Sequence, residues 1–189
     1  MSQPSTGLQL RSTVTEDGVL EISLARVPVL EPTSDEVLVR VEASPINPSD
    51  LGLLLAGADV STAKASATPE GPTVTAEIPK ALLRSVGRRI GRSLPVGNEG
   101  AGVVIAAGAS AEAQVLLGAT VAILGGGMYA QYRIVKATEC LRLPPGTTPA
   151  EGASCFVNPL TALAMVETMR IEKHSALFTP RRLRTSDRC

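Results

Sequence analysis

The stretch that decides the fold is residues 36–50, which read Glu-Val-Leu-Val-Arg-Val-Glu-Ala-Ser-Pro-Ile-Asn-Pro-Ser-Asp. Valine recurs at every second position of the first half, and this period of two predicts a strand over Glu36–Glu42. The two prolines that follow the strand force a loop that is not helical. Ser49 or Asp50 is expected to cap a short helix that contains the Leu-rich residues 51–55.

Short segments on both sides of this stretch show the alternation of β-strands. The turn residues Glu16-Asp17-Gly18 separate the first two segments, which indicates a hairpin. Glycine-rich turns separate the later ones, a pattern typical of a closed or partly closed β-barrel. We therefore predict a mainly β fold with helices (α+β), built around a partly closed barrel. The expected strands are 8–14, 19–24, 103–106, 120–124, 132–135 and 140–143.

One region, residues 56–94, differs from the rest. Residues 56–79 are rich in Ala, Thr, Ser, Pro and Gly with little periodicity, which predicts a long surface excursion. Residues 80–90 regain helical spacing, and basic side chains such as Arg84 and Arg88 share one face. That face is either a solvated helix surface or a site for a phosphate-bearing ligand.

The composition disfavours several classes of partner. The 189 residues include two Tyr, two Phe and no Trp, too few aromatic side chains for a base-stacking surface, and the formal net charge is zero. No apolar run approaches the ~20 residues that span a bilayer, and no signal peptide is visible. We expect a cytoplasmic protein with neither a nucleic-acid nor a membrane partner.

Cysteine and histidine give no catalytic or metal motif. The three cysteines, Cys140, Cys155 and Cys189, are odd in number and far apart, which fits neither a disulfide framework nor zinc spacing. The single histidine, His174, has no neighbour with which to form a catalytic pair.

Three segments instead place small or turn-forming residues beside a polar side chain, as backbone that approaches a ligand closely does. Each alone is also typical of an ordinary turn, but their joint presence in this order is more specific. The segments are Pro-Ile-Asn-Pro-Ser-Asp at 45–50, Pro-Val-Gly-Asn-Glu-Gly-Ala-Gly at 95–102 and Phe-Val-Asn-Pro-Leu-Thr-Ala at 156–162.

The three segments resemble those of the medium-chain dehydrogenase/reductase superfamily, most closely its quinone reductase and enoyl thioester reductase branches. Residues 125–132 are similar to the family's Gly-x-Tyr-Ala-x-Tyr strand entry. The resemblance covers roughly residues 37–177, except for 56–94. It implies a GroES-like barrel followed by a Rossmann domain, with the active site in the cleft between them.

The resemblance also implies chemistry without zinc. Zinc-dependent members carry Cys, His and Cys where this chain has Asn47, Asn98 and about Val157, and amides are poor zinc ligands. The implied cofactor is NADH or NADPH, which transfers a hydride to a small-molecule substrate such as an enone, an enoyl thioester or a quinone. The chain lacks the Tyr that enoyl thioester reductases carry shortly after Asn-Pro-Ser-Asp.

By resemblance, Asn47 and Thr161 are expected to be catalytic and to contact the nicotinamide. Four further polar residues are expected to line the substrate cleft. They are Asp50, Asn98, Glu99 and Asn158.

The chain is expected to divide into a GroES-like catalytic-type domain at 1–150, a linking helix with the first Rossmann strand at 151–177, and an aberrant tail at 178–189. The tail has four arginines and no glycine, unlike a nucleotide-binding turn. We expect a frameshift or premature stop after Leu177, a truncated enzyme with doubtful activity, and association into homo-oligomers through uncovered apolar surface. A non-catalytic GroES-like interaction module, or a non-functional fragment, is the alternative.

Overall fold

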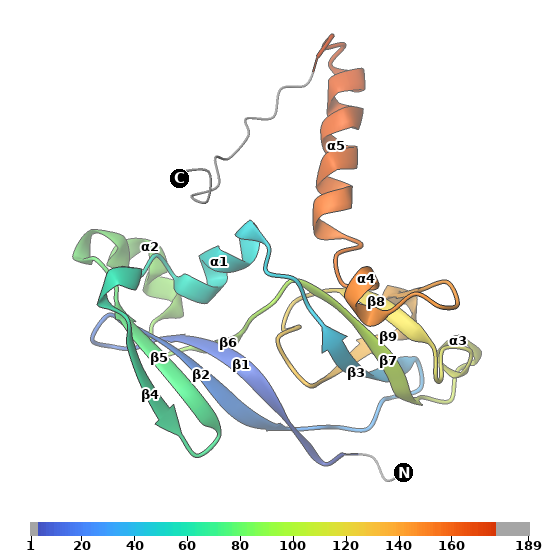
Figure 1. The fold of residues 1–189 in the computed structure, drawn as a ribbon, viewed down its shortest axis with the longest axis horizontal. Coiled ribbons are helices and arrows are strands. Elements are labelled where there is room, and N and C mark those ends of the chain that lie inside the picture. The colour runs from blue at the N-terminus through green and yellow to red at the C-terminus, as the bar shows by residue number, and fades with distance from the viewer. Residues whose placement is uncertain (1–3, 177–189) are drawn as a thin grey trace, which may run out of the picture.

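The computed structural model describes residues 4–176, and its framework is two five-stranded antiparallel sheets (Figure 1). The first sheet contains, in spatial order, β4 (Lys64–Thr68), β5 (Gly71–Glu77), β2 (Val19–Pro28), β1 (Thr6–Val14) and β6 (Ser93–Pro95). The second contains β10 (Cys140–Arg142), β8 (Thr120–Leu124), β7 (Glu99–Ala107), β3 (Glu36–Ala43) and β9 (Tyr132–Lys136). The predicted hairpin is β1 paired with β2.

Helices connect the strands and follow the last one. They are α1 (Pro48–Leu55), α2 (Leu83–Val86), α3 (Ala111–Gln114), α4 (Pro149–Gly152) and α5 (Val157–Ile171). Single 3-10 turns lie at Val60–Thr62, Lys80–Leu82, Gly87–Arg89 and Ala137–Glu139. Within residues 4–176, none of the helices has the length and apolar character needed to cross a membrane.

Strand β1 joins the two sheets. The backbone N–H of Leu10 donates to the Tyr129 carbonyl at 2.8 Å, and the N–H of Gln131 donates to the Leu8 carbonyl at 2.9 Å. The second sheet therefore curls against the edge of the first, and the result is a half-barrel (Figure 1). This confirms the predicted mainly β fold with helices and a partly closed barrel.

The first part of the decisive stretch is β3, an inner strand of the second sheet that pairs with both β7 and β9. Val37 and Val39 face the main core, while Leu38 is completely buried on the opposite face. A strand covered on both sides explains why three apolar residues stand in a row there. The core is aliphatic, and the members of its cluster that surround these valines include Val104, Leu116, Val121, Ile123 and Met128.

Residues 56–94 are not the irregular excursion that their composition predicts. Strands β4 and β5 form a hairpin that adds to β2, with Ile22 opposite Val74. The strand pairing joins residues that are far apart in the sequence. It can therefore order a segment whose own sequence gives only weak signals of secondary structure. The buried apolar cluster of this lobe consists of Val14, Leu20, Ala56, Ile78 and Val86.

Two expected helices have different bounds. Over residues 80–90 there is only the four-residue α2, flanked by 3-10 turns. Near the C-terminus, two helices stand where one linking helix is expected, the short α4, capped by Thr148, and α5. Asn158-Pro159 lies in the first turn of α5, where proline is tolerated.

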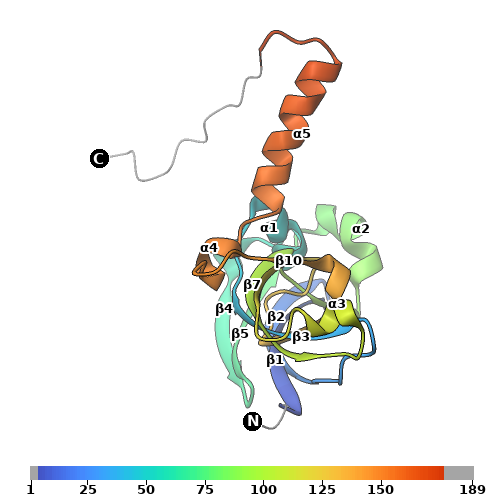
Figure 2. The same cartoon turned by 90° about the vertical axis from the view of Figure 1, so that its right-hand side faces the viewer.

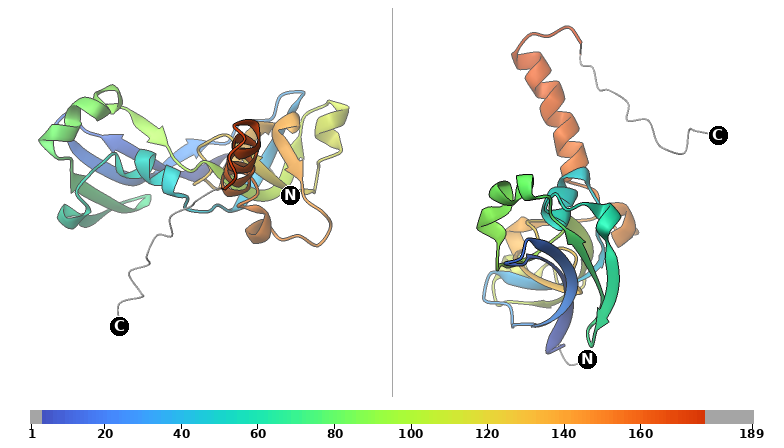
Figure 3. Two further views of the ribbon diagram at one scale, coloured as in Figure 1. Left: turned by 90° about the horizontal axis from the view of Figure 1, so that it is seen from above. Right: turned by 90° about the vertical axis from the view of Figure 1, so that its left-hand side faces the viewer.

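Helix α5 extends away from both sheets (Figures 2 and 3). Its apolar side chains are therefore open to solvent, with Leu160, Leu163 and Ile171 exposed by 49%, 56% and 74%. After this helix, Ser175 and Ala176 are not in a strand. The rest of the expected Rossmann strand, at Leu177, and the tail lie outside the described residues.

Candidate active site

Helix α1 begins at the asparagine of the Asn-Pro-Ser-Asp segment. Pro48 occupies the first helical position, where a missing N–H is harmless, and the Asp50 carboxylate accepts the Asn47 backbone N–H at 2.7 Å. The prediction that Ser49 or Asp50 caps this helix is therefore wrong, since Asn47 is the N-cap. The Asn47 side chain is only 2% exposed and bonds to the two other segments instead.

Glu99, the first residue of β7, accepts hydrogen bonds from both other segments. Its Oε1 accepts Asn47 Nδ2 at 2.8 Å, and its Oε2 accepts the backbone N–H groups of Phe156 at 2.9 Å and Val157 at 3.0 Å. The side chain is 1% exposed. A buried carboxylate needs such donors, and the positive end of the α5 dipole supplies two of them.

Asn158 and Asn98 complete the network. Asn158 Nδ2 donates to Asn47 Oδ1 at 3.1 Å. The backbone N–H of Asn98 donates to Asp50 Oδ1 at 2.8 Å, and Asn98 Nδ2 donates to the Ser49 hydroxyl at 3.0 Å. The three segments that the sequence singles out therefore meet at one place, next to the start of α5.

Glycines allow the second segment to run close to its neighbours. Gly97 has a φ of 95°, and a Cβ there would lie 2.7 Å from the backbone nitrogen of Tyr129. A Cβ on Gly102 would overlap the Arg40 carbonyl of β3. Glycine at these positions thus lets β7 hold Glu99 at the rim of the barrel.

Tyr129 holds the first segment against the second. Its hydroxyl donates to the Pro45 carbonyl at 3.0 Å. Burial, and then the negative charge of Asp50, raise the pKa of Tyr129 to about 12. The phenol is therefore neutral at physiological pH and remains a hydrogen-bond donor.

The six predicted site residues divide into two sets. The buried residues, whose polar groups bond to protein, are Asn47, Asp50 and Glu99. Asn158 and Thr161 are exposed on α5, and Asn98 is half-buried. Thr161 lies outside the network, because its hydroxyl donates to the Val157 carbonyl at 2.6 Å. Asn47 contacts the exposed set through Asn158, whose side-chain amide donates to it.

The sequence reasoning missed Ser49 and the backbone N–H groups of Phe156 and Val157. Proline in the first turn was a usable signal for the start of α5. The acceptor of those N–H groups, Glu99, is 57 residues before Phe156, and no local pattern reveals that pairing. Within residues 4–176, no three His, Cys, Asp or Glu side chains are grouped so that they could hold a metal ion.

The half-barrel that carries this polar network is a GroES-like domain of the medium-chain dehydrogenase/reductase class. The family model of the alcohol dehydrogenase GroES-like domain matches residues 33–145, and the chain belongs to this family.

Individual relatives agree with this assignment. A chloroplastic quinone-oxidoreductase homolog from Spinacia oleracea is 30% identical over 139 residues, which cover 72% of this chain and 34% of that protein. A protein named as an NADPH:quinone reductase from Mesorhizobium loti has 25% identity and a TM-score of 0.61, covering 91% of this chain and 46% of the other. The fold is also similar to Etr1p, solved with NADP and crotonyl-CoA, at 20% identity and a TM-score of 0.57 over 93% and 45% of the two chains. The chain thus spans less than half the length of these relatives.

Proposed function

We propose that this chain is the catalytic-type domain of an NAD(P)H-dependent, zinc-independent oxidoreductase that reduces a small-molecule substrate. The observation that supports this most is the network in which Glu99 binds both Asn47 and the N-terminus of α5. The network holds the start of α5, where the polar side chains of Asn158 and Thr161 are exposed. A helix start held in this way, with accessible polar groups, suits a site that must hold two reactants in one orientation.

In this proposal the two sets of residues have different tasks. The nicotinamide supplies the hydride when it is bound. Asn158 and Thr161 bind its carboxamide end, while Asn47 and Glu99 keep α5 and the Asn158 amide in place. Zinc is not required, because Asn47 and Asn98 stand where zinc-dependent relatives carry metal ligands. Stoichiometric zinc in an elemental analysis of the desalted protein would contradict this part.

Among the substrates, we favour a quinone over an enoyl thioester. The chain has Leu51-Gly52-Leu53-Leu54-Leu55 after Asn-Pro-Ser-Asp, and no Tyr there to protonate an enoyl product. The only phenol within the network, Tyr129, is bonded to a backbone carbonyl. The names of the spinach and Mesorhizobium loti relatives also refer to quinones.

The test joins this chain to the remaining part of the Mesorhizobium loti relative and measures NADPH-dependent quinone reduction. Thr161→Val should lower kcat/KM about tenfold, as the loss of one hydrogen bond that orients the cofactor does. Thr168→Val is the matched control, since Thr168 is also exposed on α5 but lies two turns away. Equal activity of the two variants, or faster reduction of an enoyl thioester than of a quinone, would contradict the proposal.

A non-catalytic interaction module is the second candidate, and the exposed apolar side chains of α5 favour it. Leu160, Leu163 and Ile171 are each about half or more exposed, and such surface is typical of protein contacts. Cofactor binding separates the two candidates, because the module requires none.

A further inference from the structure

The first sheet ends in an open edge. Within residues 4–176, β4 pairs only with β5, and Figure 1 shows it at the outer side of the sheet, away from α5. All five residues of β4 are exposed. An open strand edge presents unpaired N–H and C=O groups, to which another extended chain can bond.

The residues of β5 alternate between its two neighbours. Glu77, the last residue of β5, bonds through its N–H and its C=O to residues 59–62, directly before β4, each at 2.8 Å. Backbone groups of successive residues point to opposite sides of an antiparallel strand. Thr73 therefore also bonds toward β4, where it stands opposite Ser66.

The residues on either side of Ser66, Ala65 and Ala67, consequently turn their N–H and C=O groups away from β5. Pro72 agrees with this, because it stands opposite Ala67 and has no N–H to donate to it. The edge also lacks the usual protection against further pairing. The register with β5 has no bulge, the strand contains no proline, and Lys64 at one end is its only charge.

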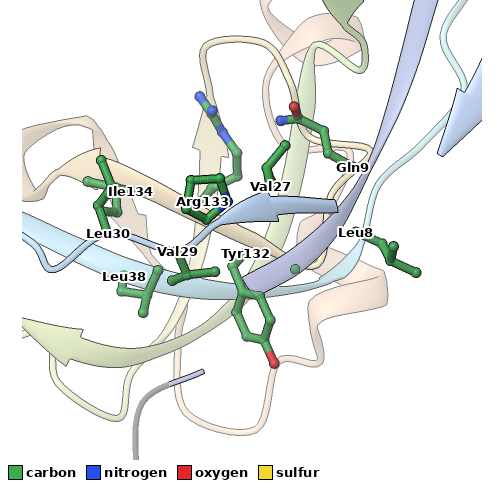
Figure 4. Close-up of a pocket in the computed structure, with 11 residues that line it drawn as sticks. Leu8, Gln9, Val27, Val29, Leu30, Leu38, Tyr132, Arg133 and Ile134 are labelled. Carbon is green, nitrogen blue, oxygen red and sulfur yellow. The ribbon is translucent and has the colours of Figure 1, made fainter. Parts of the chain in front are cut away.

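The three other sheet edges that the described residues form are less open. Strands β6 and β10 have only three residues each. Strand β9 carries the charges of Arg133 and Lys136, and β1 covers it in part. Gly7 of β1 packs against the Tyr132 ring, and residues of both strands line one pocket (Figure 4). A further strand therefore fits best at β4.

We propose that β4 pairs antiparallel with β4 of a second copy of this chain, so that the first sheets of the two copies become one continuous sheet. The two-fold axis passes beside Ser66. Ala65 exchanges both hydrogen bonds with Ala67 of the second copy, and Ala67 does so with Ala65, which satisfies all the outward groups. Lys64 stands opposite Thr68, so the two lysines lie at opposite ends of the contact.

The residues next to the strand exclude the neighbouring registers. An axis at Ala65 would place Ala67 opposite Ala63, whose N–H already donates to the Val60 carbonyl at 3.3 Å. An axis at Ala67 would place Ala65 opposite Pro69, which has no N–H. Only the register centred between the two alanines pairs every outward group. Because the same segment is complementary to itself in this register, a second copy is favoured over a peptide of unrelated sequence.

The contact is small. Stable interfaces bury about 800 Å² per partner, and a five-residue strand edge is well below this, so the dimer should form only at high protein concentration. In the dimer, the amide protons of Ala65 and Ala67 should exchange with solvent several-fold more slowly than in the dilute chain. The amide of Ser66, which already bonds to β5, should change little. NMR of the ¹⁵N-labelled chain at low and high concentration measures this.

Substitutions at the two-fold axis test the register by sedimentation equilibrium. All chains carry Leu163→Glu, which reduces association through α5. Ser66→Glu and Ser66→Lys each place like charges directly opposite one another and should weaken dimerisation about fivefold. An equimolar mixture of the two should dimerise at least as well as the parent chain, because opposite charges then face each other. Ser34→Glu, at an exposed position in the turn before β3, is the control and should have no effect.

Three results would overturn the proposal. The first is a chain that stays monomeric at every concentration, and the second is a dimer in which the Ala65 and Ala67 amides exchange as fast as in the monomer. The third is dimerisation that the two Ser66 variants leave unchanged, or that both lose without recovery in the mixture, since position 66 would then not lie on the axis.

Discussion

Glu99 decides where α5 begins. It is buried, and its two oxygens accept the Asn47 amide and the backbone N–H groups of the N-cap, Phe156, and of the first helical residue, Val157. One carboxylate thus fixes a helix start and an asparagine rotamer together. The Glu99 side chain does not reach the exposed surface of the site, so its role is to position the groups that it binds.

Glu99→Gln should therefore destabilise the chain. Glutamine has one acceptor oxygen, and its NH₂ group would face N–H donors of α5 or of Asn47. Loss of one buried charge-assisted bond and an unsatisfied donor cost about 1–3 kcal/mol. Urea unfolding should show this loss, with Glu172→Gln, an exposed position, as the control. If the two variants have equal midpoints, Glu99 does not hold α5.

Tyr129 makes stability depend on alkaline pH. Its pKa is raised from 10.0 to about 12, mainly by burial, so the unfolded chain loses the phenol proton at lower pH than the folded one. The stabilising contribution is complete below pH 10 and is lost as the pH rises toward 12. The fall in unfolding free energy between pH 9 and 11.5 should be smaller in Tyr129→Phe than in the wild type. An identical fall would show that another group is responsible.

At the scale of elements, β7 requires glycine where it packs against β3. Its glycines face β3 at closest approach, and Gly102 has no room for a side chain beside the Arg40 carbonyl. The glycine in α1, Gly52, has nothing within 4 Å of the position of a Cβ. Replacement of a glycine by alanine is therefore expected to have opposite effects on stability in β7 and in α1.

Gly102→Ala should cost more than 2 kcal/mol of unfolding free energy, because the added methyl group forces β7 away from β3. Gly52→Ala should stabilise by about 0.5–1 kcal/mol, because alanine loses less backbone entropy in a helix. Thermal unfolding of both variants measures the contrast. A stabilising Gly102→Ala would mean that the two strands are not packed as described.

Helix α5 has the opposite character, since its apolar side chains are largely uncovered. Replacing Leu163, which is 56% exposed, with Glu should change the unfolding free energy of the chain by less than about 0.5 kcal/mol. The same change should reduce concentration-dependent association, because it interrupts the apolar surface. Light scattering between low and high protein concentration tests this. Strong destabilisation by Leu163→Glu would instead show that α5 is buried in the isolated chain.

At the scale of the whole molecule, the sequence predicts elements that have a strong local signal. The valine alternation locates β3, the Glu16-Asp17-Gly18 turn locates the first hairpin, and the three polar segments do meet in space. The hairpin of β4 and β5 was missed because its order comes from pairing with β2. The burial of Asn47 was missed because its partner Glu99 is 52 residues away.

The central claim is that the start of α5 and the rim of the barrel form a nicotinamide site. The most direct measurement is an NMR titration of the ¹⁵N-labelled chain with NADPH. We predict shifts confined to the signals near Asn98, Asn158 and Thr161, saturating at millimolar NADPH because a few neutral hydrogen bonds at about 0.5–1.5 kcal/mol each give weak binding. Thr161→Val should reduce the shifts and Thr168→Val should not. Shifts elsewhere on the chain, or none at this site at saturating NADPH, would contradict the account.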